Sequence, residues 1–148
     1  MPSSQPTEIL LIEDDAIDAE LIMHCLGQTE RLKRVHLVGS GEEAIRRLRN
    51  QVPCEGDLRP DLILLDYKLP GMSAPEVLVE LKSDPSLRHI PVLVISGSVE
   101  EADVRRSYES QASAYAQKPD DLDGYLRLAH AFDSFWLEIA CYAHAGTR

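Results

Sequence analysis

The sequence predicts an α/β protein in which helices cover both faces of a parallel β-sheet. Short runs of apolar residues recur along the chain, and each is followed by a segment whose apolar residues recur at helical spacing. Most of the runs end on a carboxylate, a hydroxyl or a lysine. Alternating buried strands and amphipathic helices require right-handed crossovers. We therefore expect a doubly wound (βα)5 sandwich with a five-stranded parallel sheet and an extended C-terminal helix.

The expected strands are residues 9–12, 35–38, 61–66, 90–95 and 114–117. The first, third and fourth are almost wholly apolar, which is typical of parallel strands buried on both faces. The fifth is short and poor in β-branched residues, and we expect it because it ends directly before Lys118 and Pro119.

The expected helices are residues 16–27, a segment that begins after Ser40, a segment around 77–81, residues 100–110 and residues 122–144, with a loop at 53–60. Asp15 and Ser40 are of the residue types that cap a helix N-terminus, and Gly27 is suited to end the first helix. In the fourth helix we expect Val104 and Tyr108 to face inward.

The composition is that of one globular domain spanning residues 1–148. Of its 148 residues, 44% are hydrophobic and 27% are charged, as in ordinary globular proteins of this size. The formal net charge of −10 repels a phosphate backbone, so we expect no nucleic-acid partner. We find no secretion signal, no stretch of transmembrane length and no metal-binding or redox spacing among the three cysteines. We therefore expect a cytoplasmic protein without a membrane partner.

Polar side chains follow the expected strands at the ends where parallel strands meet. They are Glu13, Asp14, Asp66, Ser96 and Lys118. Three acids in one cleft repel one another, which favours a hard divalent cation such as Mg²⁺ among them. With the cation in place, the Asp66 carboxylate could attack a phosphorus atom and become an acyl phosphate. Lys118 and Ser96 would then bind the phosphoryl oxygens.

The set Glu13-Asp14, Asp66, Ser96 and Lys118-Pro119 resembles the receiver domain of two-component response regulators over nearly the whole chain. The resemblance implies a flavodoxin-like fold and phosphotransfer from a histidine kinase to Asp66. It also implies that the protein is not a turnover enzyme, because its catalysis is confined to its own phosphorylation and dephosphorylation.

The resemblance assigns further roles within the site. The implied Mg²⁺ ligands are Glu13, Asp14, Asp66 and the backbone carbonyl of Lys68. Ser96 and Tyr115 are implied to switch orientation together after phosphorylation, which would couple the site to the outer face. The Lys118–Pro119 peptide bond is implied to be cis. Ala74 and Gln111 stand where the family commonly has glycine.

Three longer segments narrow the resemblance: IEDDAIDAELI, LKSDPSLRHIPVLVIS and YAQKPDDLDGYLRLAHAFDSFWL. They look like the stand-alone response regulators encoded with phytochrome-type histidine kinases. The resemblance therefore implies a kinase of that type, most specifically through the segment that ends in Phe135-Trp136-Leu137.

The last expected helix carries two apolar stripes. The first has heptad spacing and comprises Tyr125, Leu128, Phe132, Phe135, Ile139 and Tyr142. The second is sufficient to pack the helix on the sheet and comprises Leu122, Leu126, Ala129, Trp136, Ala140 and Ala143. We therefore expect a core at about 7–130 and an extension at about 131–144 that forms a homodimer. The expected interface residues are Leu128, Phe132, Phe135, Ile139 and Tyr142, and the resemblance supports pairing through this region.

The same residues argue against two other functions and leave a third open. A phosphohydrolase with an aspartate nucleophile needs a second acid and a cap over the substrate, and Asp66-Tyr67-Lys68 offers neither. A flavin-binding protein needs a glycine-rich phosphate loop, whereas Glu13-Asp14-Asp15 would repel that phosphate. A third possibility, a receiver that acts as a binding platform without phosphorylation, stays open. A complete set of acids makes phosphorylation possible but does not show that it occurs.

Overall fold

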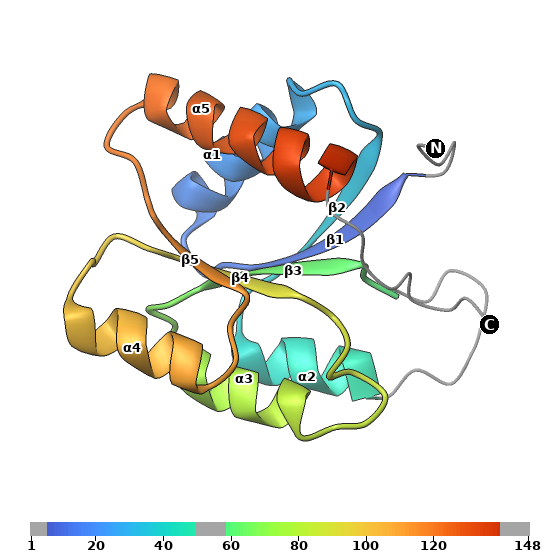
Figure 1. The fold of residues 1–148 in the computed structure, drawn as a ribbon, viewed down its shortest axis with the longest axis vertical. Coiled ribbons are helices and arrows are strands. Elements are labelled where there is room, and N and C mark those ends of the chain that lie inside the picture. The colour runs from blue at the N-terminus through green and yellow to red at the C-terminus, as the bar shows by residue number, and fades with distance from the viewer. Residues whose placement is uncertain (1–5, 50–58, 140–148) are drawn as a thin grey trace.

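A five-stranded parallel sheet in the order β2-β1-β3-β4-β5 forms the centre of the structure (Figure 1). The computed structural model describes residues 6–49 and 59–139. The strands are β1 (Thr7–Ile12), β2 (Lys33–Val38), β3 (Leu62–Asp66), β4 (Val92–Ser96) and β5 (Ala114–Gln117). Each neighbouring pair is parallel, which confirms the predicted sheet.

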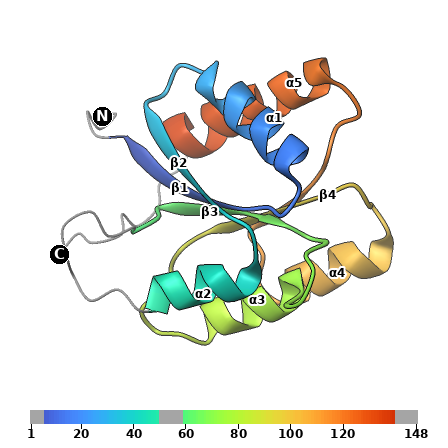
Figure 2. The same ribbon diagram turned by 180° about the vertical axis from the view of Figure 1, so that it is seen from behind.

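Helices cover both faces of this sheet. They are α1 (Ala16–Gly27), α2 (Gly41–Arg49), α3 (Ala74–Lys82), α4 (Glu101–Glu109) and α5 (Leu122–Phe132), which continues as a π-helix (Asp133–Ile139). Figures 1 and 2 show α1 and α5 on one face and α2, α3 and α4 on the other. This is the predicted flavodoxin-like arrangement. The loop expected at 53–60 lies mostly outside the described residues. Among the described helices, none combines the length and the hydropathy that a membrane span requires.

Successive residues of the central strands alternate between two apolar cores. In β1, Leu10 and Ile12 pack into the core on the α2 and α3 side, whereas Ile9 and Leu11 pack into the core on the α1 and α5 side. All four side chains are at most 1% exposed. A strand with helices on both faces has no solvent-facing side, which explains why its sequence is continuously apolar.

Side chains satisfy free amides at the N-termini of α1, α2 and α3. Asp15 caps α1 by accepting hydrogen bonds from two amides of the first turn, as predicted. The Ser40 hydroxyl accepts a hydrogen bond from an amide of α2 at 3.1 Å, also as predicted. Ser73 and Glu76 form a capping box at α3. This cap stabilises the start of the helix at Ala74, the position where the family commonly has glycine. Gln111 follows α4 with a φ of 76°, the left-handed conformation in which glycine is usual.

Helix α4 differs from its prediction. Val104 is half-buried, but Tyr108 is 49% exposed, so the expectation that Tyr108 faces inward is wrong. Ser107 is the residue of α4 that is buried. The Tyr108 hydroxyl accepts a hydrogen bond from the backbone N–H of Tyr115 at 3.1 Å. Because β5 lies at the sheet edge, Tyr108 thereby satisfies an amide that no neighbouring strand pairs.

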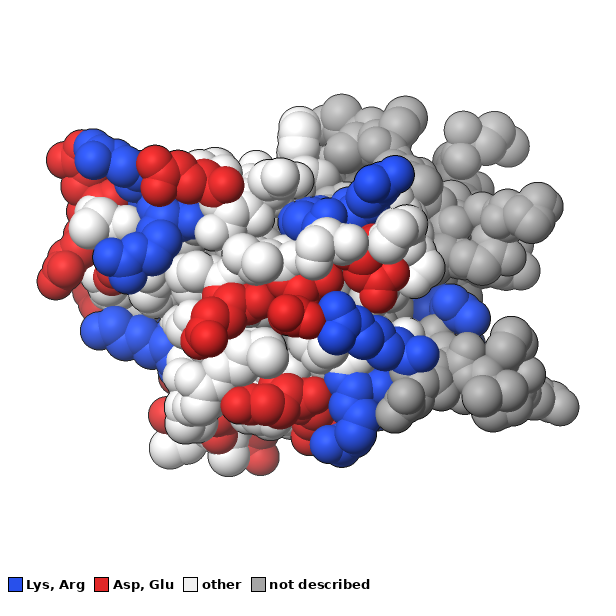
Figure 3. Space-filling view, turned by 90° about the horizontal axis from the view of Figure 1, so that it is seen from below, with Lys and Arg blue, Asp and Glu red and all other residues white. Residues whose placement is uncertain are grey.

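Acidic and basic side chains are interspersed on the face formed by α2, α3 and α4 (Figure 3). In helix α2, the acidic and basic side chains are segregated between the two ends of the helix. It carries Glu42 and Glu43 in its first turn and Arg46, Arg47 and Arg49 in its last turn. Acids near a helix N-terminus and bases near its C-terminus interact favourably with the helix dipole. These charges therefore stabilise the helix as well as solvating this face.

The C-terminal helix buries a stripe that combines members of the two predicted stripes. Tyr125, Ala129 and Phe132 are buried, and Trp136 packs against the same core while partly buried. Their spacing of four, three and four residues places them on one face of a helix. Phe132 is only 7% exposed. It is therefore a core residue, and its prediction as a dimer-interface residue is wrong.

The π-helix changes the phase of the side chains beyond Phe132. A π-turn holds more residues than an α-turn, so the heptad spacing expected across this point does not keep one face. Phe135 is 51% exposed, whereas Trp136 and Leu137 are partly buried against the core. Tyr142 and the side chain of Ile139 lie outside what the structure describes.

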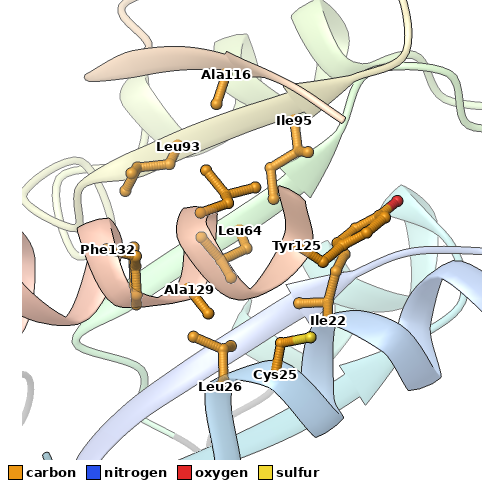
Figure 4. A pocket seen from close by; sticks show the side chains of 11 residues that line it. Ile22, Cys25, Leu26, Leu64, Leu93, Ile95, Ala116, Tyr125, Ala129 and Phe132 are labelled. Carbon is orange, nitrogen blue, oxygen red and sulfur yellow. The ribbon is translucent and has the colours of Figure 1, made fainter. Parts of the chain in front are cut away.

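A small apolar cavity of about 50 Å³ lies between α5, α1 and the sheet (Figure 4). Leu64 and Ile95 line it from the sheet, and Cys25, which is buried, lines it from α1. Leu128, which is half-buried, also lines this cavity. As an expected interface residue, Leu128 is thus only partly available to a partner.

A buried ion pair joins the start of β2 to the junction of α5 and the π-helix. Lys33 Nζ lies 3.2 Å from Asp133 Oδ1, and the two side chains are 5% and 7% exposed. Lys33 Nζ also donates to the Thr29 hydroxyl at 2.6 Å. Asp133 Oδ1 accepts a further hydrogen bond from the Arg31 N–H at 3.3 Å. These contacts fix the end of α5 against the loop between α1 and β2.

We predict that Asp133→Asn lowers the free energy of unfolding by about 3 kcal/mol, because it leaves the Lys33 ammonium buried without its counter-charge. Urea denaturation measures the change. Glu101→Gln is the matched control, since it breaks an ion pair with Arg105 whose side chains are 84% and 64% exposed. We expect this control to cost less than about 1 kcal/mol. Equal costs for both variants would contradict the prediction.

Candidate functional site

The polar residues singled out in the sequence meet at the carboxyl edge of the sheet. Asp66 is the last residue of β3 and pairs in register with Ile95 of β4. Ser96, the last residue of β4, follows Ile95 directly. Ile12 of β1 pairs with Leu65 of β3, so that the residues after β1 lie beside Asp66. The backbone N–H of Lys118 donates to the carbonyl of Ser96 at 2.7 Å. The predicted convergence of these strand ends is therefore present in the structure.

Three carboxylates form a compact group at this edge. Glu13, Asp14 and Asp66 each place an oxygen within 4.8 Å of the others. Glu13 and Asp66 are buried, whereas Asp14 is exposed. Burial raises the pKa of Glu13 to about 7; Lys118 opposes this rise and Asp66 adds to it.

This group fits a hard divalent cation. Glu13 Oε1 is buried, and its partner is the Lys118 ammonium, which lies 3.0 Å from it. Carboxylate oxygens at this spacing are the donors that such cations prefer, and a cation would offset the remaining repulsion among the three acids. Lys68 is exposed two residues beyond Asp66, and the role of its backbone carbonyl as a ligand stays a prediction.

The Lys118 ammonium lies among three carboxylates. Its Nζ is 2.8 Å from Asp18 Oδ2, 3.0 Å from Glu13 Oε1 and 3.2 Å from Asp66 Oδ1. Burial lowers the pKa of Lys118, but contacts with Asp18, Glu13 and Asp66 more than offset it, so the pKa lies above its ordinary value. No peptide bond in the described residues is cis, so the expected cis Lys118–Pro119 bond is wrong. The long lysine side chain reaches the acids from a trans bond.

Asp18 was not among the site residues predicted from the sequence. The available signal was its position three residues after the helix-capping Asp15, in the first turn of the helix that follows β1. A residue in that turn lies close to the carboxyl edge of the sheet. Its contact with Lys118 joins residues that are 100 positions apart in the chain, which spacing alone does not reveal.

The two expected switch residues are connected through Ser98. Ser96 is fully buried, and its hydroxyl accepts a hydrogen bond from the Ser98 N–H at 3.0 Å. The Tyr115 hydroxyl donates to the Ser98 carbonyl at 2.7 Å. The Ser98 hydroxyl contacts Asp103 of α4 at 3.2 Å. Ser98 thus links the strand end that carries Ser96 to both Tyr115 and α4, a role the sequence did not reveal.

Comparison with known proteins identifies the family of this site. The family model "Response regulator receiver domain" matches residues 9–128. Response regulator Rcp1 of Synechocystis sp. is 37% identical over 136 residues, covering 92% of each chain. The phosphorylated cyanobacterial phytochrome response regulator RcpA is 37% identical, with a TM-score of 0.85 over 93% of this chain and 99% of RcpA. The Mn²⁺-bound form of Rcp1 is 36% identical, with a TM-score of 0.84 over 93% of this chain and 99% of its own.

The states in which these relatives were crystallised are consistent with the geometry of the site. A structure bound to Mn²⁺ is known for one and a phosphorylated structure for the other. In this chain, Glu13, Asp14 and Asp66 form a carboxylate group whose geometry fits a divalent cation. The chain belongs to the response regulator receiver family, is similar to Rcp1, and is a phosphoacceptor signalling protein rather than a turnover enzyme.

Proposed function

We propose that this protein is a single-domain response regulator that accepts a phosphoryl group on Asp66 from a histidine kinase and signals through protein contacts. The observation that carries the proposal is the placement of the Asp66 carboxylate at the end of β3. It lies beside two further acids and 3.2 Å from the Lys118 ammonium. This combination of a nucleophilic carboxylate with nearby positive charge suits attack on an anionic phosphodonor.

In the proposed reaction, an Asp66 oxygen attacks the phosphorus of a phosphohistidine. A P–O bond forms as the P–N bond breaks, and the departing imidazole keeps the electron pair and is protonated. Lys118 is placed to neutralise charge on the phosphoryl oxygens, and Ser96 to donate a hydroxyl hydrogen bond to one of them. Mg²⁺, which Glu13, Asp14, Asp66 and the Lys68 carbonyl would hold, supplies further positive charge to these oxygens when bound. Later hydrolysis breaks the same P–O bond and returns the carboxylate and inorganic phosphate.

We propose a phytochrome-type histidine kinase as the partner. The support is similarity to RcpA, which is a phytochrome response regulator, together with coverage of nearly the whole of both chains. A cytoplasmic location stays a prediction from the sequence, as does the absence of a nucleic-acid or membrane partner. Phosphotransfer from a panel of purified kinases would identify the partner by the fastest transfer.

We predict that incubation with acetyl phosphate and Mg²⁺ adds the mass of one phosphoryl group to the wild-type protein and none to Asp66→Asn. The substitution removes the attacking oxygen while keeping the shape of the side chain. Intact-mass spectrometry measures the result. Asp15→Asn, which retains the helix cap, is the control and should be phosphorylated. Absence of added mass in wild type, or equal addition in Asp66→Asn, would overturn the assignment.

We predict that Mg²⁺ stabilises the wild-type fold and that Asp14→Asn loses most of this effect. A ligand that binds only the folded state adds about 2.7 kcal/mol at about 100 times its Kd. Asp14 is exposed, so its replacement should leave folding intact. Thermal unfolding with Mg²⁺ and with a chelator measures the difference. Asp15→Asn removes a neighbouring exposed charge, and a loss as large as that of Asp14→Asn would count against a specific site.

We also propose that the extension beyond the core pairs two copies of the chain. Phe135 is exposed beside Trp136, and the centroids of their two rings lie 5.3 Å apart in an edge-on arrangement. This aromatic pair supports an apolar contact surface there. Leu128, Ile139 and Tyr142 remain proposed members of the interface, whereas Phe132 does not.

We predict that light scattering gives a dimer for wild type at micromolar concentration and a monomer for Phe135→Glu, because the charge would be buried in the interface. Val79→Glu is the control, since Val79 is 54% exposed on α3, across the sheet. It should leave the dimer unchanged. A monomeric wild type would exclude pairing at this concentration.

A further inference from the structure

We propose that Asp18 is a positioning residue that holds the Lys118 ammonium and competes with the phosphoryl group on Asp66 for it. The inference rests on the proposed phosphorylation of Asp66. It concerns what sets the rate of that reaction and not whether the reaction occurs.

The contacts of Lys118 are the first support. Of the three carboxylate oxygens around Nζ, that of Asp18 is the nearest, at 2.8 Å, and Asp66 is the farthest, at 3.2 Å. The Lys118 side chain is 13% exposed, so water offers few alternative partners. In the unphosphorylated protein, the ammonium is therefore drawn toward Asp18 as well as toward the phosphoacceptor.

The position of Asp18 is fixed independently of the lysine. Its backbone N–H donates to the side chain of Asp15 at 3.1 Å as part of the α1 cap. Asp18 thus projects from a capped helix turn, and its own side chain is 28% exposed. An ammonium on a long, flexible side chain adjusts more readily than such a carboxylate. Asp18 is therefore suited to set where Lys118 lies.

Asp18 is separate from the group that fits a metal ion. The acids whose oxygens lie within 4.8 Å of one another are Glu13, Asp14 and Asp66, without Asp18. The contact of Asp18 within the site is instead with the Lys118 ammonium. Replacing Asp18 should consequently change the charge available from the lysine while leaving the metal ligands in place.

Phosphorylation sharpens the competition for Lys118. The transferred group brings additional negative oxygens to Asp66, next to an ammonium that Asp18 and Glu13 already contact. A carboxylate at Asp18 neutralises part of the lysine charge that would otherwise attract the anionic donor and stabilise the transferring group. An asparagine keeps the size and an acceptor oxygen but removes this charge.

The test measures the initial rate of phosphoryl incorporation from acetyl phosphate by intact mass, at saturating Mg²⁺. Initial rates exclude the contribution of later hydrolysis. We expect Asp18→Asn to react about three- to tenfold faster than wild type, the scale of one ion pair of about 1 kcal/mol. Asp18→Glu, which retains the charge, should restore a rate close to that of wild type. Asp15→Asn removes a nearby acid that does not contact Lys118 and should change the rate less than about twofold.

The same comparison in a Lys118→Met background shows whether Asp18 acts through the lysine. When the ammonium is absent, we expect Asp18→Asn to change the initial rate no more than Asp15→Asn does. Such dependence of the Asp18 effect on Lys118 would not arise if Asp18 had a purely structural role. Equal acceleration with and without Lys118 would overturn the proposal, as would a rate for Asp18→Asn equal to that of Asp15→Asn. Failure of the proposed function is distinct, because the wild-type protein would then incorporate no phosphoryl group.

Discussion

The contact of the Lys118 ammonium with acids from three other parts of the chain is the interaction on which the site depends. Glu13 follows β1, Asp66 ends β3 and Asp18 lies in the first turn of α1. Without that positive charge, buried carboxylates this close would repel one another and resist ionisation. The ammonium offsets part of this repulsion, and the remaining negative charge is what makes the cleft suited to a divalent cation.

The sheet makes this concentration of charge possible. Apolar residues bury both faces of β1, β3 and β4, and the two cores hold the strand ends in register. The polar residues of the site lie at the carboxyl edge, where parallel strands end together. The stability of the two cores supports an edge whose charges would be unfavourable on their own. The three carboxylates and Lys118 lie outside the two apolar cores, whereas Tyr115 packs against one of them.

Two connections lead from this edge to the rest of the molecule. Ser98 joins the Ser96 strand end to Tyr115 and to Asp103 of α4 through hydrogen bonds. On the opposite face, the Lys33–Asp133 ion pair fixes the end of α5, and beyond it the π-helix leaves Phe135 exposed. The proposed site and the proposed contact surface therefore belong to elements packed on one sheet, although they lie at different places on it.

The alternation of strands and helices, the doubly wound fold and the residues at the strand ends could all be predicted from the amino-acid sequence. Continuous apolar runs and the polar residues that end them carry this information locally. The folded structure was needed to show that Phe132 packs inward, that the Tyr108 hydroxyl accepts from an amide of β5 and that Asp18 contacts Lys118. Two adjacent apolar stripes on a helix do not reveal which one faces the sheet, and a π-helix shifts their phase. A contact between side chains 100 residues apart exists only once the chain has folded.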